Sequence, residues 1–148
     1  MSVAVEPSAL PLALSANLVS ALGNKRSFLR TIAERNGSTV TVYAGGEVDA
    51  ANEHTWRQLL REAAAATTPP GPLVIDTDGL DFMGGCAFTA LAEEADRCRR
   101  RGIRMCLVSA RPVVGRIIAA AALGSRLRLY PNMDTALSAA AAATSPSR

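Results

Sequence analysis

The stretch from Leu73 to Leu91 constrains the fold of this chain more than any other. It begins with the apolar run Leu73-Val74-Ile75, which follows a proline-rich turn and is typical of a buried strand. After a segment of acidic and small residues, apolar positions recur with the period of one helix face, at Phe88, Leu91, Ala92, Ala95 and Cys98. The sequence therefore predicts a strand, a loop and a helix in this order.

Gly84 and Gly85 lie between this loop and this helix. Because they have no Cβ, we expect the backbone to take dihedral angles there that other residues avoid, and the first helical N–H groups to stay uncovered. A partner's backbone or an anion would then be able to approach closely.

A hairpin is predicted before this stretch. Two strand-like runs, Leu29 to Arg35 and Ser38 to Ala44, flank Asn36-Gly37, the strongest short hairpin signal in the chain. The next two residues, Gly45 and Gly46, are expected to end the second strand. The helix that follows is expected to be capped by Asp49 or Asn52 and to bury one stripe, made of Trp56, Leu59, Leu60 and Ala63.

The second half continues the alternation of strands and helices. We expect a strand at Ile103 to Val108, a helix from Pro112 to Gly124, a short strand at Leu127 to Tyr130, and a last helix that starts at Asn132 or Asp134. The helix from Pro112 is expected to point five apolar side chains inward: Val113, Val114, Ile117, Ile118 and Ala121. This order predicts an α/β fold with a mixed, mostly parallel central sheet, an N-terminal hairpin and about four covering helices.

The charged residues of the central helix also carry predictions. Glu93 with Arg97, and Asp96 with Arg100, are spaced as weak helix-stabilising pairs. Gly102 is a natural helix end after three arginines whose charge suits the negative end of the helix dipole.

Two motifs resemble those of a known family. The segment Phe82-Met83-Gly84-Gly85-Cys86-Ala87-Phe88 resembles the Phe-hydrophobic-Asp-Ser-Ser-Gly-Leu pattern of the STAS domain, and Gly46-Glu47-Val48-Asp49 is similar to the family's Gly-Glu-Leu-Asp element, about 35 residues earlier. The family's aspartate, phosphorylatable serine and second serine fall on Gly84, Gly85 and Cys86. None of these three polar groups is kept in this chain.

The resemblance implies a STAS fold and the function of an anti-sigma factor antagonist. Such a protein binds a cognate anti-sigma factor, often of the serine-kinase type, and thereby releases a sigma factor. In the family, phosphorylation of the motif serine ends that contact. Since Gly85 has no hydroxyl, we expect no phosphorylation at this position. The residues expected to bind the partner are Glu47, Asp49, Asn52, Asp81, Phe82, Met83, Gly84, Gly85, Cys86 and Ala87.

Cys86 suggests a second form of regulation. A thiol at the start of a helix has its thiolate favoured by the helix dipole, so its pKa is expected to fall and its oxidation to become easier. The alternative is that Cys86 only replaces a small serine. Cys98 and Cys106 are expected to be buried apolar residues, and the three cysteines indicate neither a disulfide framework nor a zinc site.

At 148 residues, with 49% hydrophobic and 20% charged residues, the chain has the composition of a soluble globular domain. We expect an N-terminal extension over residues 1–28, a STAS domain over residues 29–143 and a flexible tail over residues 144–148. Ser15 to Leu22 are predicted to form a short helix ended by Gly23. Residues 1–24 have no basic side chain, and the apolar segment among them is too short for a membrane span, so a cytoplasmic protein without a membrane association is expected.

The sequence does not favour an enzyme. His54 is the only histidine and belongs to no catalytic motif, and the acidic residues Asp76, Asp78 and Asp81 fit a solvated turn better than a metal site. We expect no cofactor, no metal and no direct binding of nucleic acid, and a monomer or weak dimer. Two alternatives stay open: a STAS module that binds a small ligand or nucleotide at the exposed helix start, and a scaffold for other regulators.

Overall fold

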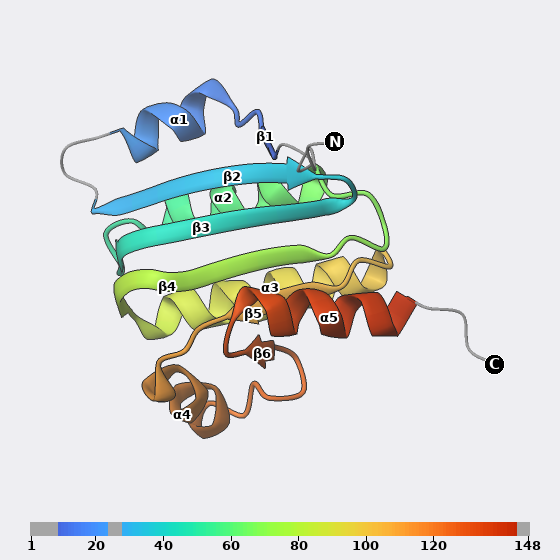
Figure 1. Ribbon diagram of the computed structural model, residues 1–148. Helices are drawn as coiled ribbons and strands as arrows, with labels where there is room; N and C mark the ends of the chain where they lie inside the picture. Colours follow the sequence, from blue (N-terminus) through green and yellow to red (C-terminus); the bar gives the residue numbers. More distant parts are fainter. Residues whose placement is uncertain (1–8, 24–27, 145–148) are drawn as a thin grey trace, which may run out of the picture.

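The computed structural model describes residues 9–23 and 28–144. Within them the elements follow in the order β1 (Leu10–Pro11), α1 (Ala16–Leu22), β2 (Leu29–Asn36), β3 (Thr39–Val48), α2 (Glu53–Ala65), β4 (Leu73–Met83), α3 (Gly85–Arg100), β5 (Met105–Val108), α4 (Pro112–Ala120), β6 (Arg128–Tyr130) and α5 (Met133–Thr144) (Figure 1). The six strands form one sheet in the order β1-β2-β3-β4-β5-β6. β1, β2 and β3 pair antiparallel, and β3 to β6 pair parallel. The predicted fold class is confirmed, with five helices in the described residues.

Two layers of helices cover the sheet. α2 and α3 lie behind it in the view of Figure 1, and α5 lies in front. The predicted stripes of α2 and α3 face the main core and are buried: Trp56, Leu59, Leu60, Ala63, Phe88, Leu91, Ala92, Ala95 and Cys98. α5 closes a smaller cluster of Val74, Cys106, Val108 and Ala136 on the other face.

The predicted hairpin is confirmed, with its turn one residue further along the chain. Asn36 pairs with Thr39, so the turn consists of Gly37 and Ser38, and Gly37 takes the positive φ of 63° that such turns require. The expected end of the second strand at Gly45 and Gly46 is wrong. β3 continues to Val48 because two shifts of register, one on either side of these glycines, absorb the irregular backbone as bulges.

β4 is also longer than the strand predicted at Leu73 to Ile75. Residues 76–83, which we expected to form a loop, pair in parallel with the second half of β3. The long β3 supplies hydrogen-bonding partners that acidic and small residues lack on their own. Gly79 permits this pairing, since a Cβ on it would lie 2.8 Å from the carbonyl oxygen of Ala44.

Helix α4 differs from its prediction in length and orientation. Pro112 begins it as expected, but it ends at Ala120 and not at Gly124, and the left-handed residue behind it is Ala122, with φ 58°. Of the five side chains expected to point inward, Val114 and Ile118 are buried and Ile117 is half-buried, whereas Val113 is 45% exposed and Ala121 is exposed. Only one side of this short helix lies against the domain. Its contact with the core is therefore limited to residues three or four positions apart, Val114 with Ile117 and Ile118.

The predicted short N-terminal helix is confirmed and packs on the domain. The Ser15 hydroxyl accepts a hydrogen bond from the backbone N–H of Leu18, Gly23 follows the helix, and Leu18 is buried in the main core. The Ser15 hydroxyl also donates to a carboxylate oxygen of Glu62 on α2, at 2.5 Å. β1 adds a short strand to the free edge of β2, which the sequence did not predict. The expected tail, apart from Thr144 at the end of α5, and residues 1–8 and 24–27 lie outside the described residues.

The last predicted helix is confirmed, with Asn132 as its cap, whose side-chain oxygen accepts a hydrogen bond from the N–H of Thr135 at 2.8 Å.

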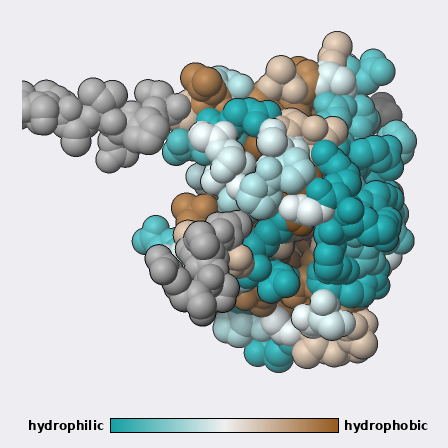
Figure 2. Space-filling view, turned by 90° about the vertical axis from the view of Figure 1, so that its right-hand side faces the viewer, coloured by the Kyte–Doolittle hydropathy of each residue, from teal (hydrophilic) through white to brown (hydrophobic). Residues whose placement is uncertain are grey.

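Figure 2 shows the end of the molecule where β3 and β4 begin, and hydrophilic residues predominate on this surface. No helix within residues 9–23 and 28–144 is long and apolar enough to span a bilayer.

The bulge at Gly46 generates a test of the fold. Gly46 has φ 93°, and a Cβ on it would lie 1.6 Å from the carbonyl oxygen of Phe28. We expect Gly46→Ala to lower the free energy of unfolding by more than about 2 kcal/mol. Gly45→Ala is the matched control, because its Cβ would meet the flexible Arg30 side chain at 3.5 Å; its effect should stay within about 1 kcal/mol. Urea denaturation of both variants measures the difference, and equal stabilities would contradict this account of the bulge.

Candidate functional site

The two family-like motifs lie side by side at the carboxyl ends of β3 and β4. Glu47 is the register partner of Phe82, and Val48 is that of Met83. The N–H of Gly84 donates to the carbonyl of Val48 at 2.8 Å, which ties the second motif to the first just before α3 begins. These residues form the left-hand end of the sheet in Figure 1, where α2 and α3 also start. Residues about 35 positions apart thus share one surface.

The candidate residues differ in their exposure. Phe82 is 52% exposed, Asp81 and Gly85 are exposed, and five others are half-buried: Glu47, Asp49, Met83, Gly84 and Cys86. Asn52 and Ala87 are buried. The accessible part of the site therefore consists of the Phe82 ring, the backbone of Gly85 and the carboxylates around them.

Asn52 organises the first loop from inside. Its side-chain oxygen accepts from the N–H of Asp49 and its side-chain nitrogen donates to the carbonyl of Glu47, both at 2.9 Å. The Asp49 carboxylate accepts from the N–H of Ala51 at 2.9 Å. The predicted capping role is therefore wrong. Asn52 occupies the N-cap position of α2, but its side chain makes no capping bond, because both of its polar ends are engaged by the preceding loop.

Gly84 and Gly85 do not have the unusual backbone that the sequence predicted. Gly84 is extended, with φ −71° and ψ 167°, and Gly85 starts α3 with ordinary helical geometry. A Cβ on Gly85 would meet no atom within 4 Å, and one on Gly84 would make only ordinary contacts, the nearest at 3.6 Å. Side chains at both positions would fit. As predicted, no side chain caps the start of α3.

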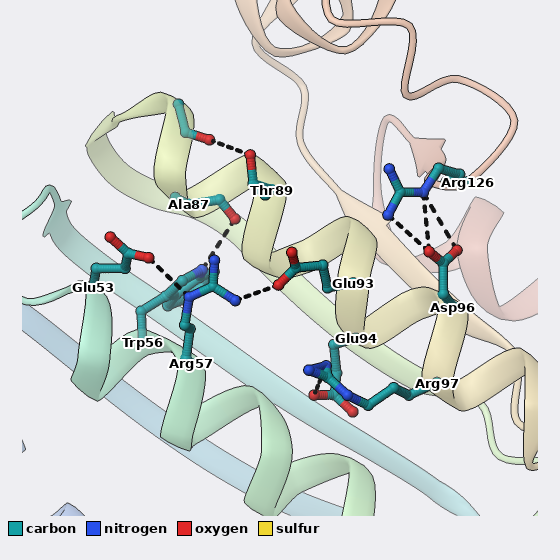
Figure 3. Close-up of polar contacts among 11 residues, drawn as sticks. Glu53, Trp56, Arg57, Ala87, Thr89, Glu93, Glu94, Asp96, Arg97 and Arg126 are labelled. Atoms are coloured by element: carbon teal, nitrogen blue, oxygen red, sulfur yellow. Dashed lines mark hydrogen bonds and ion pairs between the residues drawn. The ribbon is translucent and has the colours of Figure 1, made fainter.

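The site rests on a buried contact between α2 and α3. The indole nitrogen of Trp56, which is fully buried, donates to the carbonyl of Ala87 at 3.2 Å (Figure 3). Beside it, the Arg57 guanidinium binds Glu53, at 2.8 Å, and Glu93. The hydrogen bond from Arg57, and then its charge, hold the pKa of Glu93 below its ordinary value. α2 and α3 are thus joined directly behind the candidate surface.

The helix-internal ion pairs predicted for α3 are wrong. Glu93 pairs with Arg57, and Asp96 binds Arg126 at 2.7 Å (Figure 3). Asp96 also binds Arg99. The Asp96 pKa is lowered chiefly by its hydrogen bond with Arg126. Arg57 and Arg126 come from other segments and bind these carboxylates because packing brings their guanidinium groups within reach, while Arg99 binds Asp96 from within α3. Gly102, with φ 77°, follows the helix end as predicted.

The acidic residues of β4 make contacts within the protein. Asp76 accepts from the N–H of Asp78 at 3.0 Å, Asp78 accepts from the N–H of Ala110 at 2.8 Å, and Asp81 lies 3.8 Å from Arg111. Among the residues that the structure describes, no group of three acidic, histidine or cysteine side chains is arranged to hold a metal ion. His54 is exposed at the start of α2.

Comparison with known families agrees with this fold and this pair of motifs. The family model of the STAS domain matches residues 30–136. The chain belongs to the STAS family. The matched range begins in β2, contains both motifs and ends in α5, so the whole sheet except β1 and Leu29 lies inside it.

Two mycobacterial STAS relatives are similar over most of their length. The chain is 53% identical over 135 residues, which cover 91% of each protein, to Rv2638 of Mycobacterium tuberculosis (strain ATCC 25618 / H37Rv), whose name provisionally describes an anti-anti-sigma factor. It is 52% identical over 111 residues to the anti-sigma-F factor antagonist RsfA of Mycobacterium tuberculosis (strain CDC 1551 / Oshkosh). That match covers 75% of this chain and 87% of RsfA.

Solved STAS structures share the fold. An anti-sigma factor antagonist from Mycobacterium paratuberculosis superposes with a TM-score of 0.69 at 27% identity, covering 81% of this chain and 99% of that one. Unphosphorylated SpoIIAA, also an anti-sigma factor antagonist by its title, superposes with a TM-score of 0.60 at 17% identity, covering 76% and 96%. The second similarity concerns the fold alone.

Cys86 departs from its prediction within the STAS site. Partial burial, and then the negative charge of Glu53, raise the pKa of the Cys86 thiol, which is opposite to the expected lowering. Desolvation of the thiolate therefore outweighs the dipole of α3. Cys98 and Cys106 are buried as predicted, and burial raises the pKa of Cys98 to about 11.

The buried Asn52 side chain predicts a measurable loss of stability. Asn52→Ala leaves the N–H of Asp49 and the carbonyl of Glu47 without their side-chain partner, at a site where Asn52 is 8% exposed. We expect the free energy of unfolding to fall by about 1 to 3 kcal/mol. The exposed Ala51→Gly, in the same loop, is the control for loop flexibility. Urea denaturation compares the two, and a loss from Asn52→Ala no larger than that of the control would contradict the tethering role.

The raised pKa of Cys86 predicts its reactivity. Alkylation by iodoacetamide requires the thiolate, so the rate at Cys86 should rise with a midpoint above the ordinary cysteine pKa. Glu53→Gln should shift this midpoint to lower pH, because it removes a nearby negative charge. Glu93→Gln, which removes the other carboxylate bound by Arg57 and keeps Glu53, is the matched control. Mass spectrometry of the Cys86 peptide across pH gives the profile; a midpoint below that of a cysteine peptide would contradict the prediction.

Proposed function

We propose that this STAS protein is an anti-sigma factor antagonist. In this proposal it binds an anti-sigma factor in the cytoplasm, releases the sigma factor held by that partner, and acts by binding and not by catalysis. The names of RsfA and of the Mycobacterium paratuberculosis protein support this function, at 52% and 27% identity. Residues 29–143 form the functional domain in this proposal.

The observation that carries the proposal is the register of β3 with β4. It places Glu47 beside Phe82, and the buried Val48 beside Met83, at one end of the sheet. An aromatic ring that is 52% exposed is a suitable anchor for a partner pocket, and charged groups at the border favour orientation of the partner. We infer that the binding surface consists of Glu47, Asp49 and Asp81 to Cys86, with the buried Asn52 holding the first loop in place.

The absence of a hydroxyl group at Gly85, the first residue of α3, affects how this surface can be regulated. In the family, a phosphate on the motif serine would introduce a charge close to −2 at this point. Gly85 has no atom to phosphorylate, so a partner of the serine-kinase type would bind without being able to end the contact there. The hydroxyl of Thr89 lies one helical turn further along and donates to the carbonyl of Gly85 at 3.2 Å, so a phosphate on it would lie elsewhere on the helix.

A charge placed at position 85 tests the proposal. Gly85→Glu leaves the fold intact, because a Cβ there meets no atom within 4 Å and an acidic group suits a helix start. It would, however, bring a charge and its hydration shell into the interface. Affinity purification of wild type and variant from the source organism, followed by mass spectrometry, should recover an anti-sigma factor with wild type and at least about tenfold less with Gly85→Glu.

The control is Gly124→Glu. Gly124 is another exposed glycine with open space around its α-carbon, and it lies outside the two motifs. This variant should recover the anti-sigma factor as well as wild type does. Equal recovery with all three proteins would refute the proposed surface, and recovery of no anti-sigma factor by wild type would refute the function.

A further inference from the structure

One half of the sheet is open on the face that carries α5. In Figure 1, α5 lies in front of the β5 and β6 side, while β2 and β3 have no helix in front of them in the described part of the chain. The register aligns Ile32, Tyr43 and Asp76 in one row across β2, β3 and β4. Ile32 is 63% exposed and Tyr43 is 39% exposed. Large apolar side chains therefore lie uncovered beside a carboxylate.

This open face contains a groove of about 520 Å³, which falls within the size range of small-molecule sites. Its lining includes Arg30, Ile32, Tyr43, Gly45, Asp76 and Asp78. Gly45 has no side chain, and the guanidinium of its register partner Arg30 lies against this position, 3.5 Å from where a Cβ would be. The groove is thus bordered by an aromatic and an aliphatic side chain.

The charge around the groove is predominantly negative. Among the lining residues, Asp76 and Asp78 lie on β4 and Arg30 lies on β2; Arg111, outside the lining, donates to the backbone carbonyl of Asp78 at 3.3 Å. Burial is the main cause of the raised pKa of Tyr43 and of Asp76; the charges of Glu34 and Asp76 add to it for Tyr43, and the charge of Asp78 adds to it for Asp76. The carboxylate of Asp76 has one hydrogen bond recorded in the structure, from the N–H of Asp78, so it keeps acceptor capacity toward the groove.

We propose that this groove binds a small organic cation with an aromatic or apolar body. The ammonium group of the ligand pairs with Asp76, where carboxylates outnumber the guanidinium. Its ring lies between Ile32 and the face of Tyr43, beside the Arg30 guanidinium at Gly45, and a cation and an aromatic ring attract each other in this arrangement. The site is separate from the surface of the proposed function, which lies at the carboxyl ends of the strands, and it does not depend on that function.

Two probes of opposite charge test the proposal. Tryptamine and indole-3-propionate share an indole ring, but the first is a cation and the second an anion. Titrated into the full-length protein labelled with ¹⁵N, tryptamine should shift the amide resonances of residues around Tyr43 and Asp76. Indole-3-propionate should bind at least about tenfold more weakly, which corresponds to about 1.4 kcal/mol.

Variants of the groove complete the test. Gly45→Phe fills this part of the groove and should abolish the tryptamine shifts, and Asp76→Asn should weaken tryptamine binding about tenfold and remove the preference for the cation. The thermal transition of Gly45→Phe shows whether that variant folds. If it does not, Tyr43→Ala on the exposed face is the second test and should weaken tryptamine binding. Gly124→Phe is the control and should bind as wild type does.

Several results would overturn the inference. They are an absence of shifts at millimolar tryptamine, equal binding of the two probes, unchanged binding by Asp76→Asn, and shifts confined to Gly84 to Ala87. A dimer in solution whose interface resonances include Ile32 and Tyr43, and which excludes tryptamine, would assign the face to a second copy of the chain instead.

Discussion

The parallel pairing of β3 with β4 is the constraint on which the rest of the structure depends. Both strands run past the point where their local sequence favours a strand, and they do so together, so that Glu47 meets Phe82 and Val48 meets Met83. Each strand supplies the backbone partners that the other needs. The pairing sets the starting points of α2 and α3, since the loops that leave the two strands are joined by the hydrogen bond from Gly84 to Val48. Every residue of the proposed surface is positioned by this shared end.

Glycines serve two different physical purposes in this structure. Gly46 and Gly79 are required by the sheet, because a Cβ on either would collide with a backbone carbonyl, at 1.6 and 2.8 Å respectively. Gly84 and Gly85 are not required in this way, since both positions have room for a side chain and neither has a positive φ. Their importance is therefore chemical. They remove the carboxylate and the hydroxyl that the family pattern has at this point, and they leave the fold unchanged.

Contacts between helices support the surface from behind. Trp56 reaches across to the carbonyl of Ala87, and Arg57 joins Glu53 to Glu93, so the first turns of α2 and α3 are held in one arrangement. The same region explains why Cys86 is a poor thiolate: it is partly buried beside Glu53, and desolvation with a neighbouring carboxylate opposes the dipole of α3. The opposite, open face of the sheet has a different character, with the exposed side chains of Ile32 and Tyr43, and it offers a groove that is separate from the helix starts.

The sequence by itself determined the order of the elements, the hairpin, the buried stripes of α2 and α3, and the two motifs, because hydrophobic period and turn residues act over a few neighbouring positions. It did not determine how far β3 and β4 extend, since residues 76–83 become a strand only through pairing with a distant segment. The tertiary structure also decided the partners of Glu93 and Asp96, the inward role of Asn52 and the raised pKa of Cys86. Each of these depends on which groups from other segments lie within a few ångströms, and on how much water they exclude, and neither quantity is encoded in local sequence spacing.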